Sequence, residues 1–518
     1  MHSKQRHSFC MPGRAADLIS ALCAVFMLCV VPLLFHDAFF DINRFKVNAV
    51  LNVVPALCLI RAGISFYRRS TLSDIRRGVG APSVCMLLFL AFCVIACARL
   101  GFPRYTLTGE NGRYCGLLFL LSCGAAYYLI SLGAFRLDAV VYLAILTGAF
   151  VAGLGVLNTL GVDPLGFYAN IKRGQEHVFL STIGHFDFFG TFLILLFGLA
   201  AGYSVFAKKR SVRMLTRLAA AVMALGMSTA RTDSAFLGLH LVCFAVTALS
   251  GGCHLHFARS LMLWAIGMIS IPAMYMLLPM SPYGAAFSGL PLFLCESGAA
   301  LIVSCAMALL SIIFYALHQR GVRVPGRNSV QKIFAAVFAA VVLALLLVIV
   351  FFSVFAQDAP LPAAASILRF NDVWGSLRGF VYIRSLRAYG DYSLAEKLFG
   401  RGLETTLSIL TPYFDRPEML TFGVFNDTHC QPLQMLLTCG AFGMLAFIAF
   451  YVSMLVTVIR RAGEDPLLCG AFCSLAGYLI ILAINVTQPI LISTYFAICA
   501  VAVCRIQTNR REENRHES

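Results

Sequence analysis

Residues 184–217 read GHFDFFGTFLILLFGLAAGYSVFAKKRSVRMLTR, an apolar run followed directly by a basic block. The apolar run over 184–206 has about the 17 to 25 residues that a helix needs to cross a bilayer. Lys208, Lys209 and Arg210 come next, and basic residues are enriched on the cytoplasmic side of membrane helices. This stretch therefore predicts a transmembrane helix whose C-terminal end faces the cytoplasm.

Runs of the same kind recur along the whole chain, which is 60% hydrophobic. They predict an all-α integral membrane protein, a polytopic helical bundle of about 14 transmembrane helices, with about 12 to 14 as the range. The predicted spans are 15–35, 47–66, 83–100, 115–134, 139–160, 184–206, 213–228, 234–250, 259–278, 291–317, 332–355, 432–458, 468–485 and 488–504.

Basic residues alternate between the connections of these spans. Most of the 40 Lys and Arg residues lie before the first span or on every second connection, for example at Arg76, Arg136 and Arg210. The opposite connections hold similar numbers of acidic and basic residues. We expect both termini in the cytoplasm, and the net charge of +16 then reflects orientation among membrane lipids, with no nucleic acid as partner.

One connection is much longer than the rest. Residues 356–431 form a loop that the same alternation places outside the cytoplasm. We therefore expect a single integral membrane domain over 1–518, with this long extracytoplasmic loop carrying active-site motifs.

Polar sequence is concentrated on the predicted outer connections. It includes RYTLTGENGRY at 104–114, STIGHFD at 181–187, STARTDS at 228–234, RFNDVWGSLRG at 369–379 and NDTHC at 426–430. Ionisable groups at a membrane edge that faces a cavity are candidates for function. We therefore expect the chemistry at the outer face.

An outer active site has no ATP or nucleotide sugar at hand, and the sequence contains no GxxxxGK[ST] phosphate loop. The substrate must therefore arrive already activated, and a sugar on a lipid diphosphate fits that need. Such a donor requires arginines to hold the diphosphate and a base of near-neutral pKa to deprotonate the attacking hydroxyl. The available groups of those kinds are Arg378, Arg231, Arg113 and His429.

The chain resembles the O-antigen ligase and O-antigen polymerase family. The stretches that carry the resemblance are Gly109–Tyr114, Ser181–Asp187, Thr232–Leu237, Gly375–Gly402 and His429 with Gly440 and Gly443 after it. The resemblance implies a C-type polytopic glycosyltransferase of the bacterial cytoplasmic (inner) membrane that acts in cell-surface polysaccharide biosynthesis. It would move a glycan, with inversion, from an undecaprenyl diphosphate carrier to a hydroxyl of a surface glycan, lipid or protein, without metal or cofactor.

The family's functional residues carry over to positions of this chain. The resemblance implies that His429 is the general base or orients the acceptor, and that Arg378 clamps the diphosphate. Gly400 and Gly402 match the family's Gly-x-Gly turn, whose lack of side chains would let the backbone approach the substrate or adopt unusual dihedrals. Tyr382 stands where an Arg-x-x-x-Trp pattern has its tryptophan.

Three positions depart from the family pattern. Many members have Gly-Asn-x-Asn at 184–187, His-Asn at 429–430 and Ser-Arg-Gly at 232–234, where this chain has an acid in place of the arginine. A second diphosphate clamp could be Arg231, could be Arg113, or could be missing. The departures leave three secondary candidates for the site, which are His185, Asp187 and Asp233.

Several of these residues also have a purely structural interpretation. For Arg384 and Arg387, on the expected amphipathic helix of Arg378, we favour a solvated or lipid-headgroup face. Asp163, Asp233 and Glu110 could serve only to neutralise nearby arginines, and Glu296, inside a predicted span, could pair with a buried base. The types His185, Asp187, His429 and Cys430 could form a zinc site, but their spacing follows no metal signature, so no metal is predicted.

Two other functions remain open on the sequence alone. A lipid-linked oligosaccharide flippase should carry charge along its lumen and have short outer loops, whereas this chain has a long one. A family member without catalytic activity could serve as a partner in envelope assembly, because the three departures touch motif positions.

Overall fold

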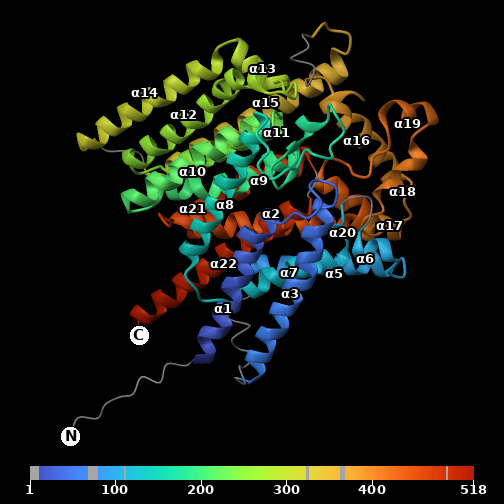
Figure 1. The fold of residues 1–518 in the computed structure, drawn as a ribbon, viewed down its shortest axis with the longest axis horizontal. Coiled ribbons are helices and arrows are strands. Elements are labelled where there is room, and N and C mark those ends of the chain that lie inside the picture. The colour runs from blue at the N-terminus through green and yellow to red at the C-terminus, as the bar shows by residue number, and fades with distance from the viewer. Residues whose placement is uncertain are drawn as a thin grey trace.

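The computed structural model of the chain describes residues 11–67, 80–109, 113–322, 326–361, 368–485 and 488–517. Within these ranges the chain is helical almost throughout (Figure 1), and the one sheet is the antiparallel hairpin of β1 (Phe179–Leu180) and β2 (Gly184–His185). The predicted all-α fold is confirmed. The predicted site stretch 109–114 is described only at its ends, and Glu110 lies outside the described residues.

Among the described residues, eleven helical stretches are long and apolar enough to cross a membrane, which makes the chain a multi-pass membrane protein. The first is Ala15–Leu33, built from α1 (Met11–Val25), η1 (Phe26–Val30) and α2 (Val31–Leu33). The others lie on α3 (Ile42–Tyr67), α5 (Ala81–Ala98), α8 (Leu137–Thr159), α9 (Phe186–Phe206), α12 (His254–Leu277) with η3 (Leu278–Met280), α14 (Ala299–Gln319), α15 (Arg327–Val350) with η4 (Phe351–Phe355), α20 (Gln431–Ala462), α21 (Pro466–Ile484) and α22 (Pro489–Glu517).

Three further predicted spans also fall on helices but do not meet the same criteria. The helices α7 (Leu117–Ser131) and α11 (Asp233–Leu249) are shorter, and α10 (Arg210–Thr229) carries three arginines in its first half. Their crossing therefore stays a prediction. The predicted span 291–317 is wrong at its start, because α13 (Gly289–Glu296) ends before α14 and leaves Glu296 exposed, outside the span.

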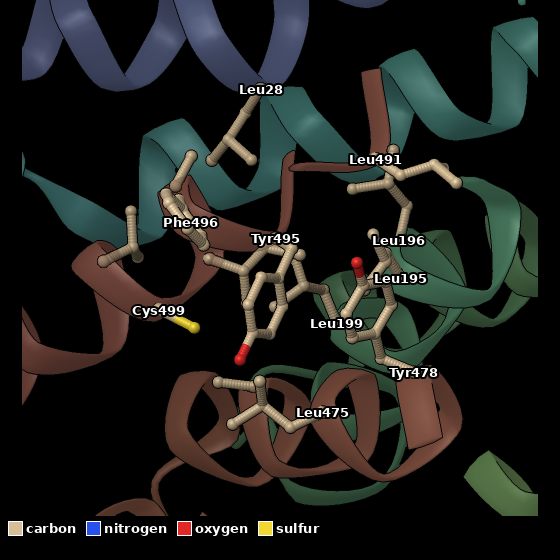
Figure 2. Packing of buried hydrophobic residues seen from close by; sticks show 14 of the residues in the cluster. Leu28, Leu195, Leu196, Leu199, Leu475, Tyr478, Leu491, Tyr495, Phe496 and Cys499 are labelled. Carbon is tan, nitrogen blue, oxygen red and sulfur yellow. The ribbon is translucent and has the colours of Figure 1, made fainter. Parts of the chain in front are cut away.

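The helix α9 lies at the centre of the bundle and is almost completely buried. A Cβ on Gly198 or Gly202 would collide with the backbone of α21 at Ser474 or Gly470, so the absence of side chains lets the two helices approach closely. Ser474 also donates a hydrogen bond to the Leu195 carbonyl at 2.6 Å. Leucines of α9 pack there against Tyr478 of α21 and Tyr495 of α22 (Figure 2). This packing fixes α9 and therefore whatever its N-terminus carries.

The long connection before α20 folds into a helical cap at one end of the bundle, away from both chain termini (Figure 1). It contains α16 (Trp374–Gly390), α17 (Leu394–Phe399), α18 (Thr406–Leu410), η6 (Thr411–Tyr413) and α19 (Arg416–Phe422). The cap has its own apolar core around Phe380, Leu410 and Phe414. The short helices α6 (Arg104–Thr108) and η2 (Glu176–Val178) complete the connections at this end.

The expected solvated face of α16 is only half right. Arg387 is exposed, but the Arg384 side chain is 9% exposed and forms ion pairs with Asp372 at 3.1 Å and with Glu418. Its guanidinium also lies 3.5 Å from the centre of the Phe380 ring. Arg384 therefore holds the cap together instead of facing solvent or lipid.

Candidate functional site

His429 lies two residues before the start of α20, in a turn that polar side chains stabilise. Asp427 Oδ1 accepts a hydrogen bond from the His429 backbone nitrogen at 2.8 Å, as aspartates do when they stabilise turns. His429 has a φ of 50°, in the left-handed region, and Pro432 lies in the first helical turn, where no N–H partner is required. The turn therefore fixes the backbone of His429 near the N-terminus of α20.

Asp427 joins His429 to Arg113, which comes from a distant part of the sequence. Its Oδ2 forms an ion pair with Arg113, and both side chains are 10% exposed. Its Oδ1 lies 3.3 Å from Nδ1 of His429. A buried carboxylate placed between a guanidinium and an imidazole can hold the imidazole with its Nε2 directed away. Burial lowers the pKa of Arg113 to about 10, so Arg113 stays charged at neutral pH.

The imidazole of His429 is kept neutral by its surroundings. Burial lowers its pKa, followed by the charges of Arg378 and Arg113 and the imidazole of His185, to about 3. The side chain is still 35% exposed, so a ligand can reach it. A neutral imidazole beside uncompensated positive charge can accept a proton, and an anion bound at those charges would raise its pKa.

Arg378 lies beside His429 at the entry of α16. Gly375, Ser376 and Leu377 before it all have positive φ, which turns the chain sharply there. The guanidinium donates from Nε to the Ile484 carbonyl at 2.8 Å and from Nη1 to the Gly375 carbonyl at 2.6 Å. These bonds hold Arg378 in place through neutral acceptors, so its charge is not cancelled.

Tyr382 connects α16 to the same turn. Its hydroxyl lies 3.0 Å from the His429 carbonyl and 3.3 Å from the Ala483 carbonyl, and it donates toward both. Tyr382 thus connects the first part of α16 to the turn before α20 and to the end of α21.

His185 and Asp187 reach the site from the hairpin at the start of α9. The Nδ1 of His185 accepts from the Asp187 backbone nitrogen at 3.3 Å, and the ring stacks on Phe186 with centroids 4.3 Å apart. Asp187 interacts electrostatically with Arg378, and His185 with His429. Burial lowers the pKa of His185. The structure therefore brings two of the three secondary candidates, His185 and Asp187, near the predicted base and clamp.

Buried polar residues on neighbouring helices anchor the β1–β2 hairpin. Lys46, which is 1% exposed, donates to the Thr182 carbonyl at 2.8 Å and to the Pro32 carbonyl at 3.4 Å. Asn158 accepts from the Ser181 nitrogen at 2.9 Å. The segment that presents His185 is therefore anchored to three helices.

Arg231 and Asp233 are not brought into this group. Arg231 donates to the carbonyls of His177 at 2.5 Å and Thr229 at 3.1 Å, and it reaches the site only through the Phe186 ring, 5.9 Å away. Asp233 accepts from the Leu290 nitrogen at 3.1 Å and so anchors the start of α13. Contact of either side chain with substrate stays a prediction.

The glycines of the predicted turn contact α20. Gly402 donates from its nitrogen to the Thr438 carbonyl at 2.8 Å, and a Cβ on Gly400 would collide with the same carbonyl. Both have positive φ, as does Gly440, where α20 is interrupted. The unusual dihedrals are therefore present, but the backbone they bring close is that of α20. Substrate contact at Gly400 and Gly402 stays a prediction.

The sequence reasoning missed Asp427 and Glu404. Asp427 was quoted within a polar stretch, and an acid two residues before a histidine is a signal that could have identified it. Glu404 has no such signal, because it reaches Arg113 only through the fold and interacts with it electrostatically. It lines a cavity of about 40 Å³ together with Arg113, Gln431 and Gln434, large enough for a few waters.

Left-handed backbone is concentrated at this end of the bundle. In the described part of the chain, all the non-glycine residues with positive φ lie on the connections at the end that carries the cap. They are Ala38, Phe102, Tyr114, Ser181, Arg231, Ser376, Leu377, Glu404 and His429. Such conformations cost about 1–3 kcal/mol each and persist where the surrounding structure imposes them, often at functional sites.

No group of three or more His, Cys, Asp or Glu residues within the described ranges is arranged to hold a metal ion. The groups that face a ligand here are the positively charged guanidinium of Arg378 and the neutral imidazoles of His185 and His429. This set suits an anion next to a proton acceptor.

Comparison with known families gives one match. A family model described as O-antigen ligase matches residues 283–448, which include Arg378, Gly400, Gly402 and His429. No curated protein shows significant similarity to the chain. The match confirms the predicted resemblance over this segment and supports a ligase- or polymerase-type membrane glycosyltransferase of glycan biosynthesis.

Proposed function

We propose that this chain, whose residues 283–448 match the O-antigen ligase family, transfers a glycan from undecaprenyl diphosphate to an acceptor hydroxyl at the outer face of the bacterial cytoplasmic membrane. One observation carries the proposal. His429, Arg378, Arg113 and His185 come from four separate parts of the sequence, and the last three all act electrostatically on His429 at one end of the bundle. A neutral base beside uncompensated guanidinium charge is what transfer from a diphosphate requires.

Arg378 binds the leaving group in this proposal. Its Nε and Nη1 are held by carbonyls, which leaves Nη2 to donate to a diphosphate oxygen. Because the two carbonyls carry no net charge, the full positive charge of Arg378 remains to stabilise the negative charge that develops on the departing diphosphate. Arginine would supply this charge without a metal ion.

His429 accepts the proton. The acceptor hydroxyl attacks the anomeric carbon from the face opposite the diphosphate, so the new C–O bond forms as the bond to the diphosphate breaks and the configuration inverts. The hydroxyl proton moves to Nε2 of His429, because Nδ1 faces Asp427. Binding of the anionic donor offsets the charges that hold the His429 pKa low, which brings the base nearer to the pH at which it works.

Arg113 positions the base in this arrangement. Its ion pair with buried Asp427 orients the carboxylate toward His429, and this pairing leaves Arg113 less suited to be a second clamp. Arg378 is therefore the principal clamp. Arg231 is hydrogen-bonded to two carbonyls and lies on the Phe186 ring, farther from His429, and it is the remaining candidate for a second contact with the donor.

The test is the lipid-linked glycan profile of a host that lacks this gene. Membranes are extracted and analysed by mass spectrometry after restoration with wild type or with His429→Ala at equal protein level. We expect wild type to deplete the undecaprenyl diphosphate glycan and to yield a longer or transferred product, and the variant to let the donor accumulate. If both proteins restore the same profile, His429 is not the base, and a flippase or an inactive assembly partner becomes the better interpretation.

A further inference from the structure

Three arginines meet at the end of the bundle opposite the candidate site. The helix α9 begins at the site and ends there at Phe206, and the guanidinium groups of Arg213, Arg217 and Arg259 surround its last turn. The three groups are close enough to repel one another electrostatically. Repulsion between half-buried like charges is unfavourable unless an anion compensates it.

Within the described residues, the hydrogen bonds of the three side chains go to carbonyls at or just after the end of α9, including a bond of 2.5 Å from Nη1 of Arg213 to Lys208. Arg213 donates from Nη1 to Ala207 at 2.8 Å, Arg217 from Nη2 to Ser204 at 3.4 Å, and Arg259 from Nη1 to Val205 at 2.9 Å. Each guanidinium has five donor hydrogens, and only one nitrogen in each is engaged. The Nε of Arg217 is buried with no partner. Most donors of the cluster are therefore available to a ligand.

Capping of α9 does not account for three arginines. The C-terminal end of a helix carries about half a negative charge, against three positive charges here. In the described part of the chain, none of the three forms an ion pair with a carboxylate. By contrast, Arg505 at the same end pairs with Asp465 at 2.6 Å and approaches Asp138 at 3.7 Å. Glu464 pairs with His256 at 3.8 Å and is largely exposed.

An apolar strip runs beside the cluster. On α10, Met214, Leu215 and Leu218 are 59%, 51% and 63% exposed, and they adjoin Arg213 and Arg217 in the sequence. Charged donors at the end of a membrane helix next to an exposed apolar strip match the two parts of a phospholipid, a phosphate headgroup and acyl chains.

We propose that Arg213, Arg217 and Arg259 form a binding site for the phosphate headgroup of an anionic phospholipid, whose acyl chains lie along Met214, Leu215 and Leu218. The guanidinium groups bind the phosphate oxygens through charge-assisted hydrogen bonds, as arginine does at phosphate sites. The ligand comes from the leaflet at this end of the bundle, and the site is independent of the transfer reaction proposed above.

The test uses the full-length protein in nanodiscs of about 30% phosphatidylglycerol and 70% phosphatidylcholine. The protein is transferred to detergent, and the retained lipid is quantified by mass spectrometry. We expect wild type to retain phosphatidylglycerol, and Arg213→Gln/Arg217→Gln/Arg259→Gln to retain at least about tenfold less. The control Arg210→Gln/Arg460→Gln/Arg461→Gln removes three exposed arginines of the same end and should retain as much as wild type.

Equal retention by the cluster variant and wild type would overturn the proposal, as would equal loss in the control. Soluble glycerol phosphate is added in a separate arm, and displacement of phosphatidylglycerol by it would show that free phosphate is the ligand. If the triple variant does not fold, a photoactivatable phosphatidylglycerol on wild type decides the question. Crosslinks at residues 214–218 support the site, and crosslinks only elsewhere overturn it.

Discussion

Arg378 and Arg384 lie on the same helix of the cap, yet the regions around them are built differently. Arg384 is buried between the carboxylates of Asp372 and Glu418, so its charge is cancelled where it stands. Arg378 is held by the carbonyls of Gly375 and Ile484, which fix its position and leave its charge intact. The partner of a buried arginine therefore indicates its role, because carboxylates neutralise the charge of an arginine whereas carbonyls only orient its side chain.

The largest effect is expected at Arg378. Arg378→Gln should lower transfer from the lipid diphosphate donor by about a hundredfold to a thousandfold, the cost of removing one group that stabilises developing charge. The midpoint of thermal unfolding should change little, because Arg378 forms no direct ion pair in the described residues and acts on Asp187 only at longer range. Product formation by purified protein in detergent measures the first, and intrinsic fluorescence on heating measures the second.

The matched control for Arg378 is Arg387→Gln, which removes an exposed arginine from the same helix and should leave transfer unchanged. If Arg378→Gln transfers glycan at the wild-type rate, Arg378 does not bind the diphosphate leaving group. The proposed difference in role between Arg378 and Arg384 would then be wrong.

Arg384→Gln should show the opposite pattern. Removing it takes the ion-pair partner from the carboxylates of Asp372 and Glu418 in the cap, and we expect the free energy of unfolding to fall by about 2–3 kcal/mol. This lies below the cost of a fully buried pair because Asp372 is 53% exposed. Denaturant unfolding in detergent measures the loss. Transfer per folded molecule should be retained, and a selective loss of transfer with full stability would place Arg384 at the substrate instead.

Asp427→Asn should have a smaller effect on catalysis. Asparagine keeps an oxygen for the His429 backbone nitrogen but weakens the charged contact with the imidazole, so kcat should fall by about tenfold with little change in the KM for donor. Asp427→Glu should recover part of the rate. A rise in KM alone, with kcat unchanged, would mean that Asp427 contributes to donor binding and does not position the base.

The smallest effect concerns protonation of His429. Because burial and nearby positive charge lower its folded-state pKa to about 3, His429 should react with diethyl pyrocarbonate, which modifies neutral imidazole, well below pH 6.5. Arg378→Gln removes one of the charges, so the midpoint of modification should move upward, whereas Arg384→Gln should leave it in place. Peptide mapping by mass spectrometry follows modification at His429 alone. An unchanged midpoint in both variants would mean that the charge of Arg378 does not lower the pKa of His429.

The same shift fixes the sign of one contribution to stability. Between pH 6.5 and about 3 the unfolded chain binds more protons at His429 than the folded chain does. His429 therefore contributes stability that is fully present above pH 6.5 and is lost as the pH falls toward 3.

The sequence was sufficient for the parts of the molecule that depend on local composition. Apolar length alone located a helix at each predicted span, since a bilayer imposes one requirement on every crossing. The prediction from the sequence was wrong for Arg384. Helical periodicity shows which face of α16 a residue occupies, but it cannot show that Asp372 and Glu418 pack onto that face. Motif reading singled out Arg378 and His429, whose roles stay predictions, but did not single out Asp427, because its ion pair with Arg113 joins distant segments of the chain.

The interruption of α20 at Gly440 has a practical consequence for protein engineering. The backbone of Gly402 is hydrogen-bonded to the Thr438 carbonyl, and a Cβ on Gly440 would collide with Leu398, so the first turns of α20 are structurally part of the cap. A chimera that exchanges the cap between two related proteins should therefore place its junction inside the membrane helix, after Gly440. A junction at Gln431, where the helix begins, would separate surfaces that fit together through main-chain atoms and that no side-chain substitution can restore.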